Sequence, residues 1–73
     1  MAEIKVLSEL AGRVWQIEVQ TGARVDEGDQ LLILESMKME IPVVAPVSGT
    51  VTAILVGKED TVSEGQALVV MST

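Results

Sequence analysis

The sequence contains no cysteine and no histidine, and its only aromatic residue is Trp15. Without cysteine, neither a disulfide framework nor a thiolate metal site can form, so a chain of 73 residues has to fold by packing alone. Without histidine, there is no Ser/His/Asp or Cys/His catalytic system and no imidazole ligand for a metal. We therefore expect neither catalysis nor metal binding from this chain by itself.

Positive charge is also scarce, with 5 lysines and arginines against 11 acidic residues and a net charge of -6. Phosphate binding needs clustered basic side chains and usually stacking aromatics, so nucleic acid is not an expected partner. The chain has no signal peptide and no run of about 20 apolar residues, which predicts a cytoplasmic protein without a membrane partner. The acidity suits a solvated surface or attraction to basic partner surfaces.

What the sequence has is apolar residues (48%) in short segments with strand-like patterns. In Val14–Gln20, strict alternation places Trp15, Ile17 and Val19 on one face and the other residues on the opposite face. Turn signals separate such segments at Gly22 and at residues 26–29, 57–60 and 63–66. This spacing is typical of an all-β sandwich or barrel.

An internal repeat organises the chain. Shifting the sequence by 37 positions gives 11 identities over 36 aligned pairs, among them Gly12 with Gly49 and Gly28 with Gly65. We predict one domain, 1–73, made of two quasi-repeats at about 1–36 and 38–73, packed around a pseudo-twofold axis. The repeated Glu-Gly pairs mark turns in which glycine can adopt a positive φ at little steric cost.

The connection between the two repeats is Met37-Lys38, followed by Met39. It lacks the Asn-Gly or Asp-Gly that usually forms a tight hairpin turn. Under the repeat symmetry this connection is equivalent to the paired chain ends, so we expect Lys38 at one end of the barrel and both termini near the other. Met37 and Met39 either fill part of the core or form an exposed, adaptable recognition surface.

Lys38 is the residue best placed to carry chemistry. A lysine amine is almost entirely protonated at neutral pH. Lys38 therefore suits modification by a separate enzyme better than a role as a base. Glu35 and Glu40 could form an acid/base pair, but beside an exposed lysine we interpret them as solvated charges.

The segment Glu35–Val51, ESMKMEIPVVAPVSGTV, resembles the biotinyl/lipoyl attachment domain family, and most closely its biotin carboxyl carrier domains and small free-standing attachment proteins. In that family a Met-Lys-Met hairpin carries the modified lysine, and Ala-Pro and Gly follow, here at Ala45-Pro46 and Gly49. The resemblance covers essentially the whole chain. It implies a flattened barrel, called a hammerhead, of two four-stranded antiparallel sheets.

The resemblance also implies a function. Biotin protein ligase would attach biotin to Lys38, and the loaded domain, itself not an enzyme, would carry a carboxyl group from a biotin carboxylase to a carboxyltransferase of the acyl-CoA carboxylase type. Met37 and Met39, with Glu35, would contribute to recognition by the ligase and the partner subunits. Lipoyl domains share the fold but typically carry Asp-Lys-Ala or Asp-Lys-Val, so the two methionines favour biotin.

Two alternatives remain open on the sequence alone. One is a lipoyl carrier for a 2-oxoacid dehydrogenase or the glycine-cleavage system, or an acceptor of both groups. The other is an unmodified β-barrel interaction module.

The sequence departs from the wider family in two respects. Val19–Asp29 is too short for the protruding thumb of some bacterial carriers, and the chain shows no Pro/Ala-rich linker. We expect a carrier that reaches its partners by diffusion or docking, and a monomer when isolated, since the net charge opposes self-association.

Overall fold

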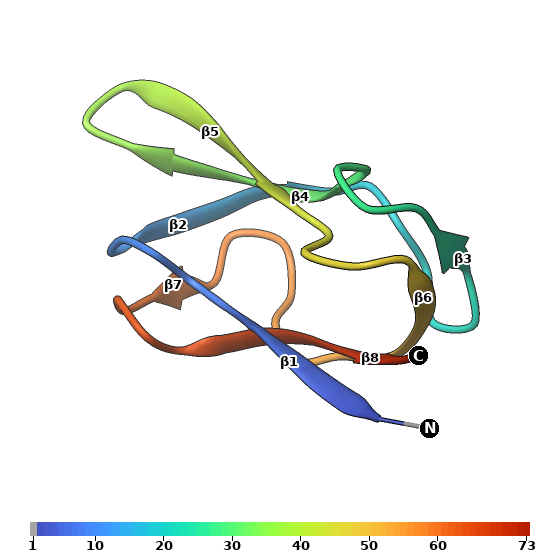
Figure 1. Cartoon of the computed structure of the whole chain (residues 1–73). Helices are drawn as coiled ribbons and strands as arrows, with labels where there is room; N and C mark the ends of the chain where they lie inside the picture. Colours follow the sequence, from blue (N-terminus) through green and yellow to red (C-terminus); the bar gives the residue numbers. More distant parts are fainter. Residues whose placement is uncertain (1) are drawn as a thin grey trace.

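The computed structural model describes residues 2–73, and every regular element in this range is a β-strand (Figure 1). The eight strands are β1 (Glu3–Leu7), β2 (Gly12–Ile17), β3 (Arg24–Val25), β4 (Gln30–Ser36), β5 (Met39–Val44), β6 (Gly49–Ile54), β7 (Thr61–Val62) and β8 (Ala67–Ser72). The all-β prediction is confirmed.

The strands form two four-stranded antiparallel sheets, ordered β1-β8-β6-β3 and β5-β4-β2-β7. Each sheet combines two strands from the first half of the chain with two from the second half. Exchanging every strand with the one four places along the chain converts one order into the other. Neither half therefore forms a sheet by itself, and the strands of the two halves are interleaved.

The equivalence of the halves extends to irregular details. The pairing of β2 with β4 skips Trp15, and the pairing of β6 with β8 skips Thr52, 37 positions later. Such a skipped residue is a β-bulge, which bends the strand and increases its twist. The predicted Glu-Gly turns also match, since Gly28 and Gly65 have φ of 92° and 84°.

The bulge at Trp15 makes the predicted alternation of Val14–Gln20 wrong at its start. Val14 is fully buried, whereas Trp15 remains 38% exposed, because the extra residue reverses the order of inward and outward side chains. The strand also ends at Ile17 rather than Gln20. Residues 18–23 have to leave the sheet of β2 and reach β3 in the other sheet, although Glu18 N still donates a hydrogen bond to Leu31 O.

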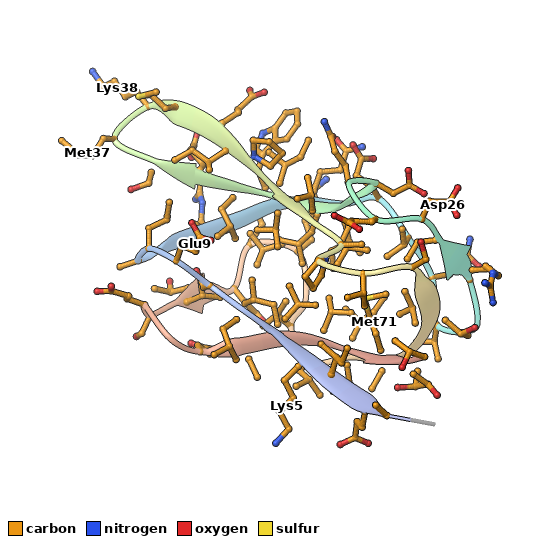
Figure 2. All side chains as sticks on the ribbon, viewed as in Figure 1. Lys5, Glu9, Asp26, Met37, Lys38 and Met71 are labelled. Atoms are coloured by element: carbon orange, nitrogen blue, oxygen red, sulfur yellow. The ribbon has the colours of Figure 1, made fainter. Side chains whose placement is uncertain are left out.

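The core lies between the two sheets and is entirely aliphatic or methionine. Figure 2 shows Met71 of β8 pointing into this space. The buried residues of the core are Val6, Val14, Val25, Leu31, Leu32, Leu34, Ala45, Val51, Val62, Leu68, Val69 and Met71. Because these residues come from both halves of the chain, folding of one half requires the other.

The molecule is elongated, with extents of 36 × 18 × 17 Å. At one end Thr73 N donates a hydrogen bond of 2.9 Å to Ala2 O. The turn between β4 and β5 lies at the opposite end (Figure 1), which confirms the predicted separation of Lys38 from the chain ends; Met1 lies outside the described residues. Within residues 2–73, no helix is long and apolar enough to cross a membrane.

Candidate functional site

The site is built on the hairpin of β4 and β5. Glu35 pairs with Glu40 and Ser36 pairs with Met39, so only Met37 and Lys38 remain for the turn. A two-residue turn allows the ladder to continue to the tip, and the hairpin therefore holds Lys38 at a fixed place at the end of the molecule.

Met37 and Lys38 have φ of 52° and 64°. Two consecutive positive values are the pattern of a type I′ turn, whose twist matches that of the flanking strands. Asn and Gly favour this conformation, and methionine and lysine do not. The pairing of β4 with β5 therefore imposes the turn, and the residues at its tip are not those that local preference would select.

All three residues at the tip are exposed. Met37 is 92% exposed and Met39 is 63% exposed, so neither methionine fills the core. Lys38 and Met37 extend beyond the end of the barrel in Figure 2. The two apolar side chains and the amine together form a surface that another protein can reach without any change in the backbone.

Glu35 lies one pair of residues behind the tip and is held by Arg13 of β2. Arg13 Nη2 and Glu35 Oε1 are 2.9 Å apart, and the two side chains are 53% and 36% exposed. An ion pair this exposed stabilises the fold by at most about 1 kcal/mol. It is the only salt bridge within residues 2–73, so Glu40, directly opposite Glu35, has no cationic partner within salt-bridge distance in that range. Sequence reasoning missed Arg13, because nothing local signals a contact 22 residues away.

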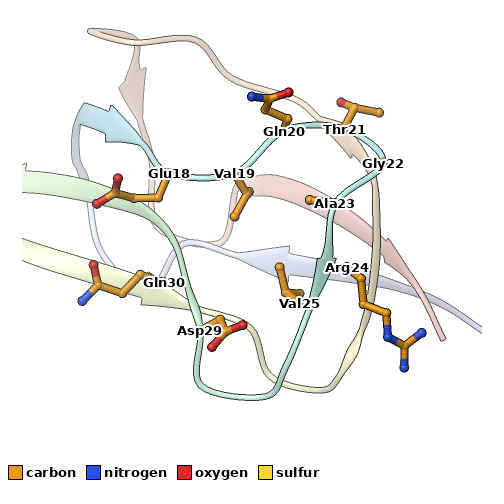
Figure 3. A pocket seen from close by; sticks show the side chains of 10 residues that line it. All are labelled: Glu18, Val19, Gln20, Thr21, Gly22, Ala23, Arg24, Val25, Asp29 and Gln30. Atoms are coloured by element: carbon orange, nitrogen blue, oxygen red, sulfur yellow. The ribbon is translucent and has the colours of Figure 1, made fainter.

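Other features of the surface contribute no chemistry near Lys38. A shallow hollow of about 730 Å³ is lined by residues 18–25 with Asp29 and Gln30 (Figure 3). It adjoins β3, at the far end of the barrel from the turn between β4 and β5 (Figure 1). An apolar groove of about 430 Å³ runs between the edge strands β1 and β5. Within residues 2–73, no group of three acidic side chains is arranged to hold a metal ion.

The site is thus a two-sheet barrel with an exposed lysine on the turn between β4 and β5. The chain belongs to the biotin/lipoyl family: the family model described as "Biotin-requiring enzyme" matches residues 3–71. This confirms the resemblance inferred from the Met-Lys-Met segment.

Two small proteins are similar over almost their whole lengths. The chain is 42% identical over 64 residues to a biotin/lipoyl attachment protein of Bacillus subtilis, covering 88% of each. It is 42% identical over 72 residues to the biotinylated protein TB7.3 homolog of Mycobacterium leprae, covering 99% of this chain and 100% of the relative.

Solved structures with the same fold are parts of much larger chains. The urea carboxylase of Kluyveromyces lactis matches with a TM-score of 0.93 and 35% identity over 99% of this chain, which corresponds to 6% of that enzyme. A single-chain, multi-domain long-chain acyl-CoA carboxylase matches with a TM-score of 0.88 and 34% identity, over 93% of this chain and 7% of that one. These similarities confirm the predicted fold class.

Proposed function

We propose that the protein is a biotin carboxyl carrier and that Lys38 is the residue to which biotin is attached. One observation carries the proposal: Lys38 is one of the two residues of the turn at the end of the barrel, with exposed Met37 and Met39 on either side. The names of the relatives support biotin as the group, since they include a biotinylated protein and a biotin carboxyl carrier protein.

The site fits a covalently attached group. Attachment needs an amine that is free to react, and within residues 2–73 no carboxylate forms an ion pair with Lys38. The reaction would proceed from an acyl-adenylate made by biotin protein ligase. Lys38 Nζ gives up a proton and forms an amide bond to the acyl carbon, while the bond between that carbon and AMP breaks.

Biotin, once attached, supplies a ring nitrogen that can hold a carboxyl group. The contribution of the protein is to hold the point of attachment at the end of a rigid barrel and to keep the group at high effective concentration near its partners. Those partners would be a biotin carboxylase and a carboxyltransferase, because relatives of the chain are parts of carboxylases. The carrier itself would not be catalytic. We propose that it acts in the cytoplasm.

The test is intact mass and peptide mapping after expression with biotin, lipoate and both ligases. We expect one biotin adduct, located on Lys38, and none in Lys38→Arg. The matched control is Lys58→Arg, because Lys58 is also an exposed lysine in a turn. This control should be biotinylated as the wild type is.

The same experiment separates the alternatives. A lipoyl adduct alone on Lys38 would make the protein an acyl or aminomethyl carrier, and adducts of both kinds would make it a dual acceptor. An unmodified Lys38 would leave an interaction module. Biotin persisting in Lys38→Arg at another residue would overturn the assignment of the site.

A further inference from the structure

The repeat allows each outward-facing residue to be compared with a residue at the same backbone position in the other sheet. On the sheet that carries Lys38, the bulge residue of β2 is Trp15, and its equivalent in β6 is Thr52. Pro42 of β5 corresponds to Lys5 of β1. Since Thr and Lys occupy these backbone positions in the other half, the fold itself does not require Trp15 or Pro42.

Trp15, Ile33 and Pro42 form an apolar patch across β2, β4 and β5, which we call the outer patch. Ile33 pairs with Pro42 on one side and with Gln16, next to the bulge at Trp15, on the other. Ile33 lies between Leu32 and Leu34, whose side chains are buried, and its cross-strand partners Gln16 and Pro42 are exposed, which places it on the outer face. Trp15 is 38% exposed and Pro42 is exposed. A tryptophan that keeps 38% of its surface exposed, at a position where the other sheet carries threonine, suggests a partner.

The outer patch is continuous with the turn. Pro42 of β5 follows Lys38 by four residues. At a rise of about 3.3 Å per residue this is a distance of about 13 Å along the strand. Between them Glu35 pairs with Glu40 on the same face. Arg13 balances Glu35, so Glu40 leaves a net negative charge between the outer patch and the lysine. A partner surface with basic side chains beside an apolar region would complement this arrangement.

The enzyme that first acylates Lys38 has to approach closely, because its active site must receive the lysine nitrogen itself. Later partners reach a group on an extended arm and can stay farther from the sheet. The surface closest to the hairpin is therefore covered during the first reaction.

We propose that the outer patch is the docking surface for the enzyme that attaches the acyl group to Lys38. This inference rests on the proposed function. The enzyme would cover Trp15 with an apolar surface and place basic side chains toward Glu40. Tryptophan is the residue type most enriched among interface positions that dominate affinity, so Trp15 is the expected anchor.

The test uses purified biotin protein ligase and the full chain as its substrate. Trp15→Thr installs the residue that the other sheet carries at the same position, and Thr52→Trp is the matched control on the opposite sheet. We expect Trp15→Thr to lower kcat/KM about tenfold or more, mainly through KM. Thr52→Trp should leave kcat/KM within about twofold of the wild type, and Trp15→Phe should retain much of the activity. Circular dichroism and urea unfolding verify that each variant is folded.

The charge of Glu40 and the contact of Trp15 with the ligase are tested separately. Glu40→Gln should weaken the salt dependence of the reaction, whereas Glu3→Gln, at the equivalent position on the other sheet, should not. Because Trp15 is the only tryptophan, ¹⁵N-labelled carrier gives one indole N–H signal, which should shift or broaden when unlabelled ligase is added.

The outcomes distinguish this inference from the proposed function. Equal kcat/KM for wild type and Trp15→Thr, or an indole signal unaffected by saturating ligase, would overturn the docking surface alone. A wild-type chain that accepts no biotin would overturn the proposed function and the docking surface together.

Discussion

Three residues other than glycine have positive φ within residues 2–73, and two of them, Met37 and Lys38, form the turn of the site. Side chains in this conformation cost about 1–2 kcal/mol per residue relative to ordinary backbone angles. The strands β4 and β5 supply the free energy that holds the turn. The identities of the side chains at the tip are therefore not set by the conformational preference of the turn.

Glu59 is the third such residue, with φ of 74°, and the equivalent residue in the first half is Gly22, with φ of 95°. The backbone contacts are equivalent as well, since Glu59 N donates to Val14 O and Gly22 N donates to Val51 O. Glycine is the residue suited to this conformation. The second half therefore retains a strained residue where the first half has none.

Substitutions at Glu59 and at Gly22 should change the free energy of unfolding in opposite directions. Glu59→Gly should raise the free energy of unfolding by about 0.5–1 kcal/mol, because the relief of strain exceeds the entropy cost of glycine. Gly22→Glu should lower it by about 1 kcal/mol or more. Urea unfolding measures both. Lys58→Gly, at a position without positive φ, is the control and should be destabilising; an equal loss for Glu59→Gly would contradict the argument.

At the residue scale, the sequence predicted Lys38 at an exposed tip, and it predicted the glycines with positive φ at Gly28 and Gly65. It failed at Trp15, because a bulge inserts a residue without changing the local pattern of hydrophobicity. The repeat holds a signal that Trp15 faces outward: its equivalent is Thr52, and a core residue is seldom replaced by threonine in a repeat. Pairing and register then settle which side chain faces outward.

Among the elements, two strands approach their neighbours more closely than a side chain allows. A Cβ added to Gly12 would lie 2.7 Å from Glu35 O, and one added to Gly49 would lie 2.5 Å from Ser72 O. Both contacts are with backbone, which cannot move without disturbing the ladder. These glycines allow β2 to approach β4 and β6 to approach β8, and the repeat in the sequence reflects this requirement.

Gly49→Ala should therefore destabilise the protein by about 1–3 kcal/mol, the usual cost of overpacking a well-packed position. Gly57→Ala is the control, since its nearest contact would be 3.6 Å from an exposed aspartate side chain. We expect that variant to stay within about 0.5 kcal/mol of the wild type. Equal losses in the two variants, measured by urea unfolding, would mean that the close approach at Gly49 is not the cause.

Strand boundaries were the least predictable feature at this scale. The turn residues and the alternation of apolar residues indicated β-strands throughout, and this was correct. The two-residue strands β3 and β7 carry too few residues to show a period. The end of β2 at Ile17 depends on where the chain crosses to the other sheet, which is a property of the assembled fold.

For the whole molecule, the two ends of the barrel are equivalent except for the chain connection. Thr73 and Ala2 meet through a backbone hydrogen bond, as Ser36 and Met39 do through their pairing. A circular permutant can therefore join Thr73 to Ala2 through Asn-Gly, which favours a two-residue turn. Its new ends can be placed between Met37 and Lys38.

We expect this permutant to unfold cooperatively with a urea midpoint close to that of the wild type, because every strand pair is retained. Biotin protein ligase should not modify Lys38 in it, although the residue is present and exposed, because the turn that holds it has been opened. Intact mass measures the second outcome. Efficient biotinylation of the permutant would show that the turn is unnecessary for recognition.

The joining of two equivalent halves also sets how many lysines of this kind the molecule can hold. Two copies of a sequence placed in tandem have a single joint, and here that joint is the turn of Met37 and Lys38. At the opposite end Thr73 N donates a hydrogen bond to Ala2 O. The copies are nearly interchangeable in backbone, but the described molecule is polar, because this turn lies at one of its ends; the proposed attachment at Lys38 therefore predicts one biotin per chain.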